Sequence, residues 1–394
     1  MKKKVKQLDW FIFGPFIFLS LLGIIIIFSA SAGFSGSPYT FLFKQFTFFI
    51  ISLLIIFFFY FFGKLSWISS IRNNSIILLL VFLLLIFARI SPPTAGTGAH
   101  GWINLYFLNI QPAELFKVSV ILYLSALSAE KMRRRTKKRV FPLENTNSNE
   151  EKTLFGFRCS QLFFILLNLI LIASMPDFGN FFIALFLILI VILSSGIKTR
   201  YILLIIALIT IGYVLLPTLL KILPNSFLNG QYSLKRFLIF LNPWPYAHKE
   251  SLQLIDSFYA ISRGGLFGTG LGNSIEKMGY LPEPNTDFIM SVLIEELGTI
   301  WLIIIIGLIL MMIGRIFYIS FHLKNNFARI SLFGIASYFF IQVLVNLGGI
   351  ISVIPMTGVT FPFISYGGSS MLVNSISIGI ICLISRDYRN RKIK

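Results

Sequence analysis

Charged residues are scarce in this chain of 394 residues, and acidic residues are the scarcest. Charged side chains make up 12% of the sequence, where soluble domains carry about a quarter, and Asp and Glu together number 15. The two cysteines, Cys159 and Cys382, have no neighbours at metal-ligand spacing and exclude a disulfide scaffold. Hydrophobic residues reach 56%, which excludes a disordered protein and exceeds what one soluble core of this size can hide.

The apolar residues that dominate the sequence come in long runs, of the length that crosses a bilayer at about 20 residues per helix. Each run predicts a helix, because only a helix satisfies its own backbone within hydrocarbon without closing a barrel. The sequence therefore predicts an all-α polytopic membrane protein, a single integral membrane domain over residues 1–394 with about ten transmembrane helices. The ten predicted spans lie near 10–31, 41–62, 74–91, 112–129, 157–175, 179–196, 200–222, 286–314, 327–354 and 362–385.

The positions of the basic residues predict the orientation in the membrane. With the N-terminus in the cytoplasm, 25 of the 34 lysines and arginines fall on the inner segments, so both termini are expected to be cytoplasmic. The net charge of +19 is then a topology signal with affinity for anionic lipid, and we expect no nucleic-acid partner.

Two loops are unusual in length or charge. Residues 130–157 are rich in arginine and lysine and are predicted to form a flexible cytoplasmic loop or linker. Residues 223–285 form the largest predicted extracytoplasmic loop, and its aromatic side chains are too many for simple disorder. Loops of this length are usually functional or disordered, so the second loop is the first place to look for a site.

Three carboxylates are predicted to lie at the outer ends of helices: Glu114, Asp177 and Asp287. Ionisable groups at membrane depth are costly, and each is a functional hypothesis. Asp287 follows Pro284, Asn285 and Thr286, so we expect it in the first turn of the next helix. There it is either a carboxylate that stabilises the helix start or a general base that faces outward.

Two other acids, Glu295 and Glu296, lie farther along the same predicted helix. Glu295 is turned by about 80° from Asp287 and lies about 12 Å deeper, while Glu296 points to the opposite face. Glycosidase carboxylates are separated by about 5–9.5 Å, so no local pair is expected. Hydrogen bonds between helices, or hydrogen bonds that cap a helix end, are the plainer interpretation of both glutamates.

Lys117 follows Glu114 by three residues and therefore lies on the same helix face. The two side chains form either an intrahelical ion pair or a site where the cation is held near a lipid phosphate. Arg263 and Lys277, in the large outer loop, are the other candidate cations, and solvated loop charges are the plainer interpretation of those two.

Several motifs together resemble the SEDS family (shape, elongation, division, sporulation), the FtsW/RodA group, and most closely its division branch. They occur in the family's order and cover most of the chain. The matching pieces are Gly101-Trp102-Ile103, Gln111–Glu114 with Lys117, Pro176–Gly179, Ser257–Gly272, Lys277–Glu283, Thr286–Ile289, Glu295–Gly298, Pro355-x-Thr357-Gly358 and Pro362–Ser370. The chain departs from the family pattern at Asn285, where His is usual, and at Gly101, where Arg is usual.

The resemblance implies a membrane peptidoglycan glycosyltransferase that polymerises lipid II, with undecaprenyl pyrophosphate as the leaving group. It implies a class B penicillin-binding protein and other membrane proteins of the division machinery as partners, and a place at the division septum. The family's essential acid falls on Asp287, expected to act as the general base. The expected substrate-binding residues are Glu114, Lys117, Arg263, Lys277, Glu283 and Ser369, with no protein metal site assigned. The leaving group could be neutralised by these cations or by a divalent cation, Mg²⁺ or Mn²⁺, that bridges the phosphates.

Three other functions stay open from the sequence. A transporter that flips the lipid-linked precursor requires a polar path near mid-depth, to which Glu295 and Glu296 are the most favourable residues. A polymerase of the elongation branch has the same chemistry in another process. A scaffold of the division machinery requires no acid at all.

Overall fold

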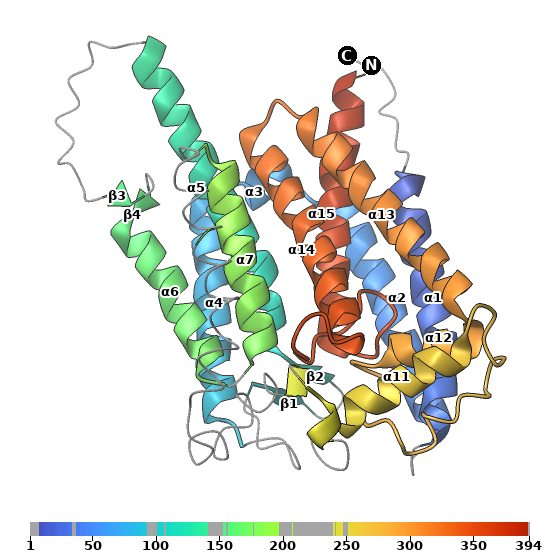
Figure 1. Ribbon diagram of the computed structural model, residues 1–394. Helices are drawn as coiled ribbons and strands as arrows, with labels where there is room; N and C mark the ends of the chain where they lie inside the picture. The colour runs from blue at the N-terminus through green and yellow to red at the C-terminus, as the bar shows by residue number, and fades with distance from the viewer. Residues whose placement is uncertain are drawn as a thin grey trace.

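The computed structural model describes residues 8–33, 37–92, 101–105, 108–140, 153–154, 157–175, 177–196, 207, 239–240, 242–246 and 251–392. This part of the chain forms a helical bundle with two short antiparallel hairpins (Figure 1). Helix α1 begins and helix α15 ends at the same end of the bundle, in agreement with the expected placement of both termini on one side of the membrane.

Nine of the ten predicted spans correspond to helices of the described residues. Seven helices are long and apolar enough to cross a membrane: α1 (Trp10–Ala30), α2 (Pro38–Phe62), α4 (Ile71–Ile90), α5 (Pro112–Val140), α13 (Thr299–Phe321), α14 (Asn326–Ile350) and α15 (Gly368–Lys392). Two shorter apolar helices, α6 (Cys159–Ala173) and α7 (Phe178–Ser194), match two further predicted spans. The predicted span 200–222 lies outside the described residues, except for residue 207.

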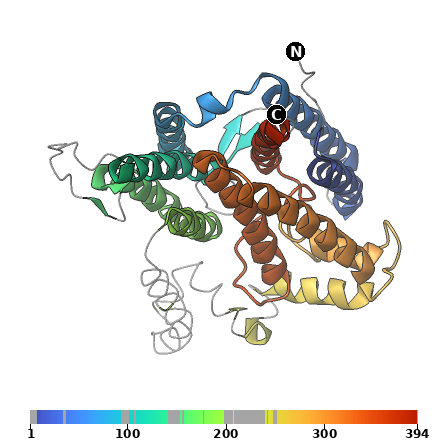
Figure 2. The ribbon, with the colours of Figure 1, turned by 90° about the horizontal axis from the view of Figure 1, so that it is seen from above.

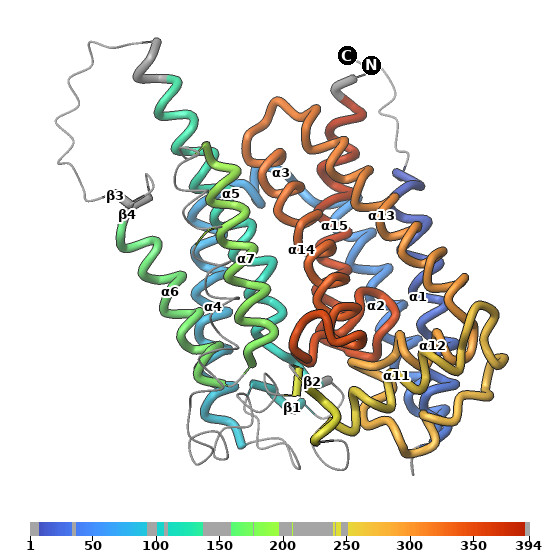
Figure 3. Tube along the Cα trace, viewed as in Figure 1, coloured from blue at the N-terminus to red at the C-terminus, as the bar shows by residue number. Residues whose placement is uncertain are grey.

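The helices divide into two groups around α14. Seen along the bundle, α4–α7 lie on one side of α13 and α14, and α1 and α2 lie on the other (Figure 2). Helix α14 contacts α5 and α7, and α15 packs along α2. The short helices α11 (Leu252–Gly264) and α12 (Ile289–Leu297) contact each other at the end of the bundle opposite to the start of α1 (Figure 3). They lie at the predicted outer face.

The smaller elements complete the described chain. They are η1 (Ser31–Gly33), α3 (Leu65–Ile68), the hairpin of β1 (Ile103–Leu105) and β2 (Leu108–Ile110), the hairpin of β3 (Thr153–Leu154) and β4 (Phe157–Arg158), and η2 (Trp244–Tyr246). Ile103 of β1 pairs with Ile110 of β2. This hairpin leads directly into α5, so it fixes where the outer end of that helix begins.

The predicted span 286–314 is wrong as one continuous helix. It is broken at Gly298, which has a φ of 87° and separates α12 from α13. A side chain at this position would overlap the carbonyl oxygen of Leu266. The amides of Thr269 and Gly270 donate to the last carbonyls of α12, at Glu295 and Glu296, at 2.9 Å each. The loop before α12 therefore ends this helix, which hydrophobicity alone could not predict.

Two other boundaries differ from the prediction. Helix α5 continues to Val140, so the basic segment expected as a flexible loop over 130–157 begins as a helix. Long basic side chains are good helix formers, and Arg134 pairs with Glu130 one turn earlier at 3.1 Å. Helix α15 begins at Gly368 and not at 362, because residues 361–367 belong to the loop that follows α14.

Candidate active site

The segment that carries Asp287 is fixed by its peptide carbonyls. Three consecutive carbonyl oxygens each accept one hydrogen bond from the C-terminal part of the chain. That of Asn285 accepts from the Tyr366 amide at 2.9 Å, and that of Thr286 accepts from the Ser365 hydroxyl at 2.7 Å. The carbonyl of Asp287 accepts from the Asn346 side-chain amide at 3.0 Å.

This pairing explains why the prediction for the start of the helix is wrong. We expected Asp287 in the first helical turn, but α12 begins at Ile289 and Phe288 occupies the N-cap position. The carbonyls of residues 285–287 are occupied by the C-terminal loop and α14, so helical pairing begins with the Phe288 carbonyl, which accepts from the Ser291 amide at 2.9 Å. Asp287 therefore lies in a turn before the helix.

The carboxylate of Asp287 is partly buried and faces Gly358, in the loop between α14 and α15. Gly358 has a φ of 71°, and a Cβ atom added there would lie 3.3 Å from Asp287 Oδ2. An l-residue with a side chain is strained at this φ. The backbone at this position therefore favours glycine, and glycine places no Cβ atom beside Asp287 Oδ2.

A polar network joins the outer ends of α5 and α7. Lys117 Nζ lies 2.7 Å from Glu114 Oε1 and donates to Asn180 Oδ1 at 2.8 Å. Asp177 caps α7, accepting from the Asn180 amide at 3.1 Å, and also accepts from the Gln111 side chain at 2.8 Å. Lys117 and Glu114 are buried. The structure thus contains the intrahelical ion pair, and the lysine does not point outward to a phosphate.

The loop between α14 and α15 also contacts this network. Gly179, in the first turn of α7, packs so closely on Thr357 that a Cβ atom would overlap the Thr357 carbonyl oxygen. Ser369 accepts from the Gln111 amide and donates to the Asn109 carbonyl, both at 2.8 Å. The loop 351–367 and the start of α15 therefore bring together residues that are far apart in sequence: Asp287 on one side, and the Gln111–Asp177–Lys117 network on the other.

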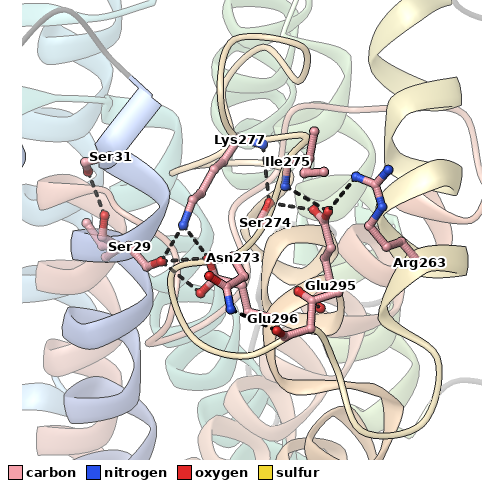
Figure 4. Close-up of polar contacts among 11 residues, drawn as sticks. Ser29, Ser31, Arg263, Asn273, Ser274, Ile275, Lys277, Glu295 and Glu296 are labelled. Carbon is pink, nitrogen blue, oxygen red and sulfur yellow. Dashed lines mark hydrogen bonds and ion pairs between the residues drawn. The ribbon is translucent and has the colours of Figure 1, made fainter.

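The second predicted cation, Lys277, is buried in another ion pair. Its Nζ lies 2.5 Å from Glu296 Oε1 and donates to the Ser29 hydroxyl at 2.8 Å (Figure 4). Side-chain exposure is 1% for Lys277 and 0% for Glu296, so this ion pair ties the outer loop to α1. In this conformation the Lys277 ammonium is directed to Glu296 and Ser29, not to the outer surface.

Glu295 and Arg263 form the neighbouring cluster of Figure 4. Glu295 accepts from the Ser274 hydroxyl at 2.5 Å and from the Ile275 amide at 3.0 Å. Arg263 Nη1 lies 3.5 Å from Glu295 and 3.9 Å from Glu276, and its side chain stays 42% exposed. Both glutamates at 295 and 296 thus make interhelical and loop contacts, as the plainer interpretation of the sequence had it, and neither is paired with Asp287.

Burial and charge also perturb two acids of the outer loop. Burial raises the pKa of Glu276 above its ordinary value, the negative charges of Asp256 and Glu295 add to the rise, and Arg263 opposes it. Burial likewise raises the pKa of Asp256. Within the described residues no group of three or more His, Cys, Asp or Glu side chains could hold a metal ion.

The last predicted site residue, Glu283, lies on the surface and has a positive φ of 53°. It accepts from the Thr286 hydroxyl at 3.2 Å, within the turn that leads to Asp287. Sequence reasoning missed Asn346 and the role of Ser365. The available signal was weak: Asn346 is one of two carboxamides, with Gln342, inside a mostly apolar predicted span, and Ser365 lies in a stretch of small residues that close helix packing also explains.

Comparison with known proteins gives a family match over nearly the whole chain. The family model FTSW_RODA_SPOVE, described as a cell cycle protein, matches residues 9–390. A protein of Lactococcus lactis subsp. lactis (strain IL1403), named probable peptidoglycan glycosyltransferase FtsW, is 36% identical over 98% of this chain and 94% of its own length. A protein of Bacillus subtilis (strain 168) with the same name is 34% identical over 98% of this chain and 92% of its own length.

Solved structures share the fold. One chain of a structure described as "Structural coordination of polymerization and crosslinking by a peptidoglycan synthase complex" superposes with a TM-score of 0.69 at 24% identity, covering 97% of this chain and 98% of that chain. The crystal structure of the Thermus thermophilus rod shape determining protein RodA gives a TM-score of 0.63 at 22% identity, covering 96% of this chain and 97% of that chain.

Proposed function

The chain belongs to the FtsW/RodA/SpoVE family of cell cycle proteins and is a multi-pass membrane peptidoglycan glycosyltransferase, and we propose that it polymerises lipid II at the outer face of the membrane with Asp287 as the general base. The relatives described above carry the name of the division branch. We therefore assign its reaction to septal wall synthesis during division.

The proposed reaction has few chemical requirements. The 4-hydroxyl of the acceptor sugar attacks the anomeric carbon of the donor, and a positioned base that accepts its proton accelerates such a step typically ~10²–10⁴-fold. The leaving group is a lipid pyrophosphate, which departs as an anion and needs cations, not a proton. One carboxylate therefore suffices, and direct displacement inverts the configuration of the anomeric carbon.

The observation that carries this proposal is the position of Asp287. The main chain of residues 285–287 is fixed by three hydrogen bonds from residues 346, 365 and 366, while the Asp287 carboxylate lies beside Gly358, in a loop at the outer end of the bundle. A general base has to be held rigidly, and the substrate has to reach it. The three hydrogen bonds hold the segment that carries Asp287, and Gly358 places no Cβ atom beside its carboxylate.

The predicted binding residues fall into two roles. Arg263 is the partly exposed cation of the set, so we assign it to the pyrophosphate, with a phosphate-bound divalent cation as the alternative. Glu114, Lys117, Lys277 and Ser369 are buried, so we assign them to the shape of the site instead of direct contact. Glu283 is exposed beside the Asp287 turn and stays a candidate contact for the substrate.

We also propose a class B penicillin-binding protein as the partner. A similar fold occurs in a complex described as coordinating polymerization and crosslinking, and newly made glycan strands are the material that a transpeptidase crosslinks. Other membrane proteins of the division machinery would bring this pair to the septum.

The test is polymerisation of labelled lipid II by the purified protein together with its partner transpeptidase. Asp287→Asn keeps the shape of the side chain and removes its basicity, so polymer should be lost while thermal stability and lipid II binding remain. Glu130→Gln is the matched control, because Glu130 is an acid on the opposite, cytoplasmic end of α5. Wild-type polymer lengths from Asp287→Asn would remove Asp287 as the base.

Variants of the same two acids, Asp287 and Glu296, distinguish the polymerase from the flippase and the scaffold. In vesicles, a flippase would transfer lipid II between leaflets without making polymer, and that transfer would be lost in Glu296→Gln but not in Asp287→Asn. A scaffold would support division in cells that carry Asp287→Asn. Either result would contradict the proposed reaction.

A further inference from the structure

We propose that Asn346 is a positioning residue for the reaction: its single carboxamide holds Asp287 and the Gly358–Val359 segment at a fixed separation. This inference rests on the proposed function, because it gives a role to the residue that supports the proposed base. Asn346 Nδ2 donates to the Asp287 carbonyl at 3.0 Å and to the Val359 carbonyl at 2.7 Å. The two contacts flank the place where Gly358 faces the Asp287 carboxylate.

The orientation of the carboxamide follows from its partners. Both partners are carbonyl oxygens, which only accept, so the NH₂ end of the side chain has to face them and both of its hydrogens are used. The other end of the group, Asn346 Oδ1, is buried with no hydrogen-bond partner among the described residues. The carboxamide therefore joins the two segments while its own oxygen stays buried without a hydrogen bond. An apolar side chain of similar size would pack there without leaving a buried acceptor unsatisfied, so packing alone does not explain an asparagine at this position.

The hydrogen bonds of the neighbouring residues show why Asn346 acts at Asp287 in particular. Ser365 and Tyr366 contact the carbonyls of Thr286 and Asn285, one and two residues before the acid. Asn346 contacts the peptide of Asp287 itself, and it does so from α14, a helix that packs against α5 and α7. The position of the Asp287 Cα is thereby tied to the centre of the bundle and not only to a loop.

The same helix offers a matched control one turn earlier. Gln342 is also a buried carboxamide, and its Nε2 donates to the Thr360 carbonyl of the same loop at 3.1 Å. Its oxygen is likewise buried without a partner in the described part of the chain. Gln342 therefore shares the side-chain chemistry, the burial and the loop contact of Asn346, but its hydrogen bond goes to Thr360, whereas Asn346 donates to both Val359 and Asp287.

The experiment compares Asn346→Leu with Gln342→Leu in lipid II polymerisation, lipid II binding and thermal unfolding. Asn346→Leu removes two donated hydrogen bonds and Gln342→Leu removes one, so a larger loss of thermal stability is expected in Asn346→Leu, and kcat is measured on the folded fraction of each variant. A misplacement of about 1 Å can cost about 10²-fold in rate, so Asn346→Leu should lower kcat by an amount of this order with lipid II affinity unchanged. Gln342→Leu should lower kcat much less. Equal losses of kcat in both variants would assign Asn346 a structural role only and would overturn the proposal.

Two further sets of measurements cover the cases in which a leucine variant does not fold or the proposed base is itself wrong. If either leucine variant fails to fold, the reciprocal one-methylene changes Asn346→Gln and Gln342→Asn replace them, and kcat should fall only in the first. Asp287→Asn is measured in parallel. Loss of polymer in Asp287→Asn together with a normal kcat in Asn346→Leu would refute the positioning role and leave the base in place. Normal polymer in Asp287→Asn would refute the base itself.

Discussion

Two aspartates lie just before helices at opposite ends of this bundle, and they are held in different ways. Asp9 caps α1, accepting from the Phe11 amide, and its buried carboxylate lies 3.0 Å from Arg315 and 2.6 Å from Arg389. Asp287 precedes α12 and is fixed through its main-chain carbonyl, with its carboxylate beside Gly358. At the cytoplasmic end the charge is neutralised by α13 and α15, whereas at the outer end the backbone is fixed and the carboxylate faces a glycine.

The comparison suggests how a structural acid and a chemical acid can be told apart in a membrane protein. A carboxylate that is buried between arginines links the helices that carry them. When its charge is removed, the arginines lose that counter-charge. An acid that is fixed through its main-chain carbonyl keeps that hydrogen bond when its carboxylate is replaced by an amide, because the backbone group is unchanged. The three predictions below test that contrast, from the largest expected effect to the smallest.

The largest effect on stability is expected at the Asp9 cluster. Asp9→Asn leaves two arginines without their counter-charge, and breaking a buried pair in this way typically costs about 3–5 kcal/mol. We expect the lower end, about 3 kcal/mol, because Arg315 and Arg389 keep 28% and 25% side-chain exposure. Thermal unfolding in detergent measures the loss, and the folded fraction should polymerise lipid II at the normal rate. A stable Asp9→Asn protein with a slow rate would reverse the assignment of the two acids.

A smaller effect is expected where Asp287 meets the loop. Gly358→Ala and Gly272→Ala both place a side chain at positive φ, 71° and 87°, which costs roughly 1–2 kcal/mol in stability. Only the first adds a methyl group 3.3 Å from Asp287 Oδ2, since nothing lies within 4 Å of the second. We expect equal losses of stability in the two variants, but a loss of polymerisation in Gly358→Ala alone. That result would show that the space beside the Asp287 carboxylate serves the reaction and not the fold. Loss of activity in both variants would show that the glycines act through the fold.

Much of this architecture could be predicted from the sequence, because apolar runs determine which segments enter the membrane. The Glu114–Lys117 pair was also within reach, since three residues place both side chains on one helix face. The Lys277–Glu296 pair was not, because it depends on how the outer loop folds back onto α1. The break at Gly298 was missed because hydrophobicity continues across it, and it is the loop before α12 that imposes the turn.

The Asp287 site shows the same limit. The sequence indicated the correct acid for attention but placed it inside the helix, because Pro284 and Asn285 look like a helix start. What moves the helix start to Ile289 is the use of three carbonyls by residues about 60–80 positions later in the chain. Contacts at that separation leave no periodic signal in one sequence. Asn346 was missed for the same reason.

The smallest expected effect concerns Glu276, a buried acid whose arginine partner, Arg263, is more distant, at 3.9 Å, than the two arginines of Asp9. Burial and the charges of Asp256 and Glu295 raise the pKa of Glu276. An acid whose pKa is raised on folding binds its proton more tightly in the folded state, so folding is least penalised at low pH. The free energy of unfolding therefore falls as pH rises from the ordinary pKa of 4.5 through the raised pKa, and it falls no further at higher pH.

Glu276→Gln mimics the protonated form and should therefore raise the thermal midpoint slightly at neutral pH. The advantage over the wild type should shrink as pH falls through the raised pKa of Glu276 and vanish below 4.5, the ordinary pKa. Thermal unfolding between pH 4 and 8 measures both parts, with Glu130→Gln as the control at a partly exposed acid. A midpoint lowered at neutral pH would mean that the contact of Glu276 with Arg263, at 3.9 Å, outweighs burial. Glu276 would then resemble Asp9, and the outer loop would hold a second acid that is neutralised by an arginine.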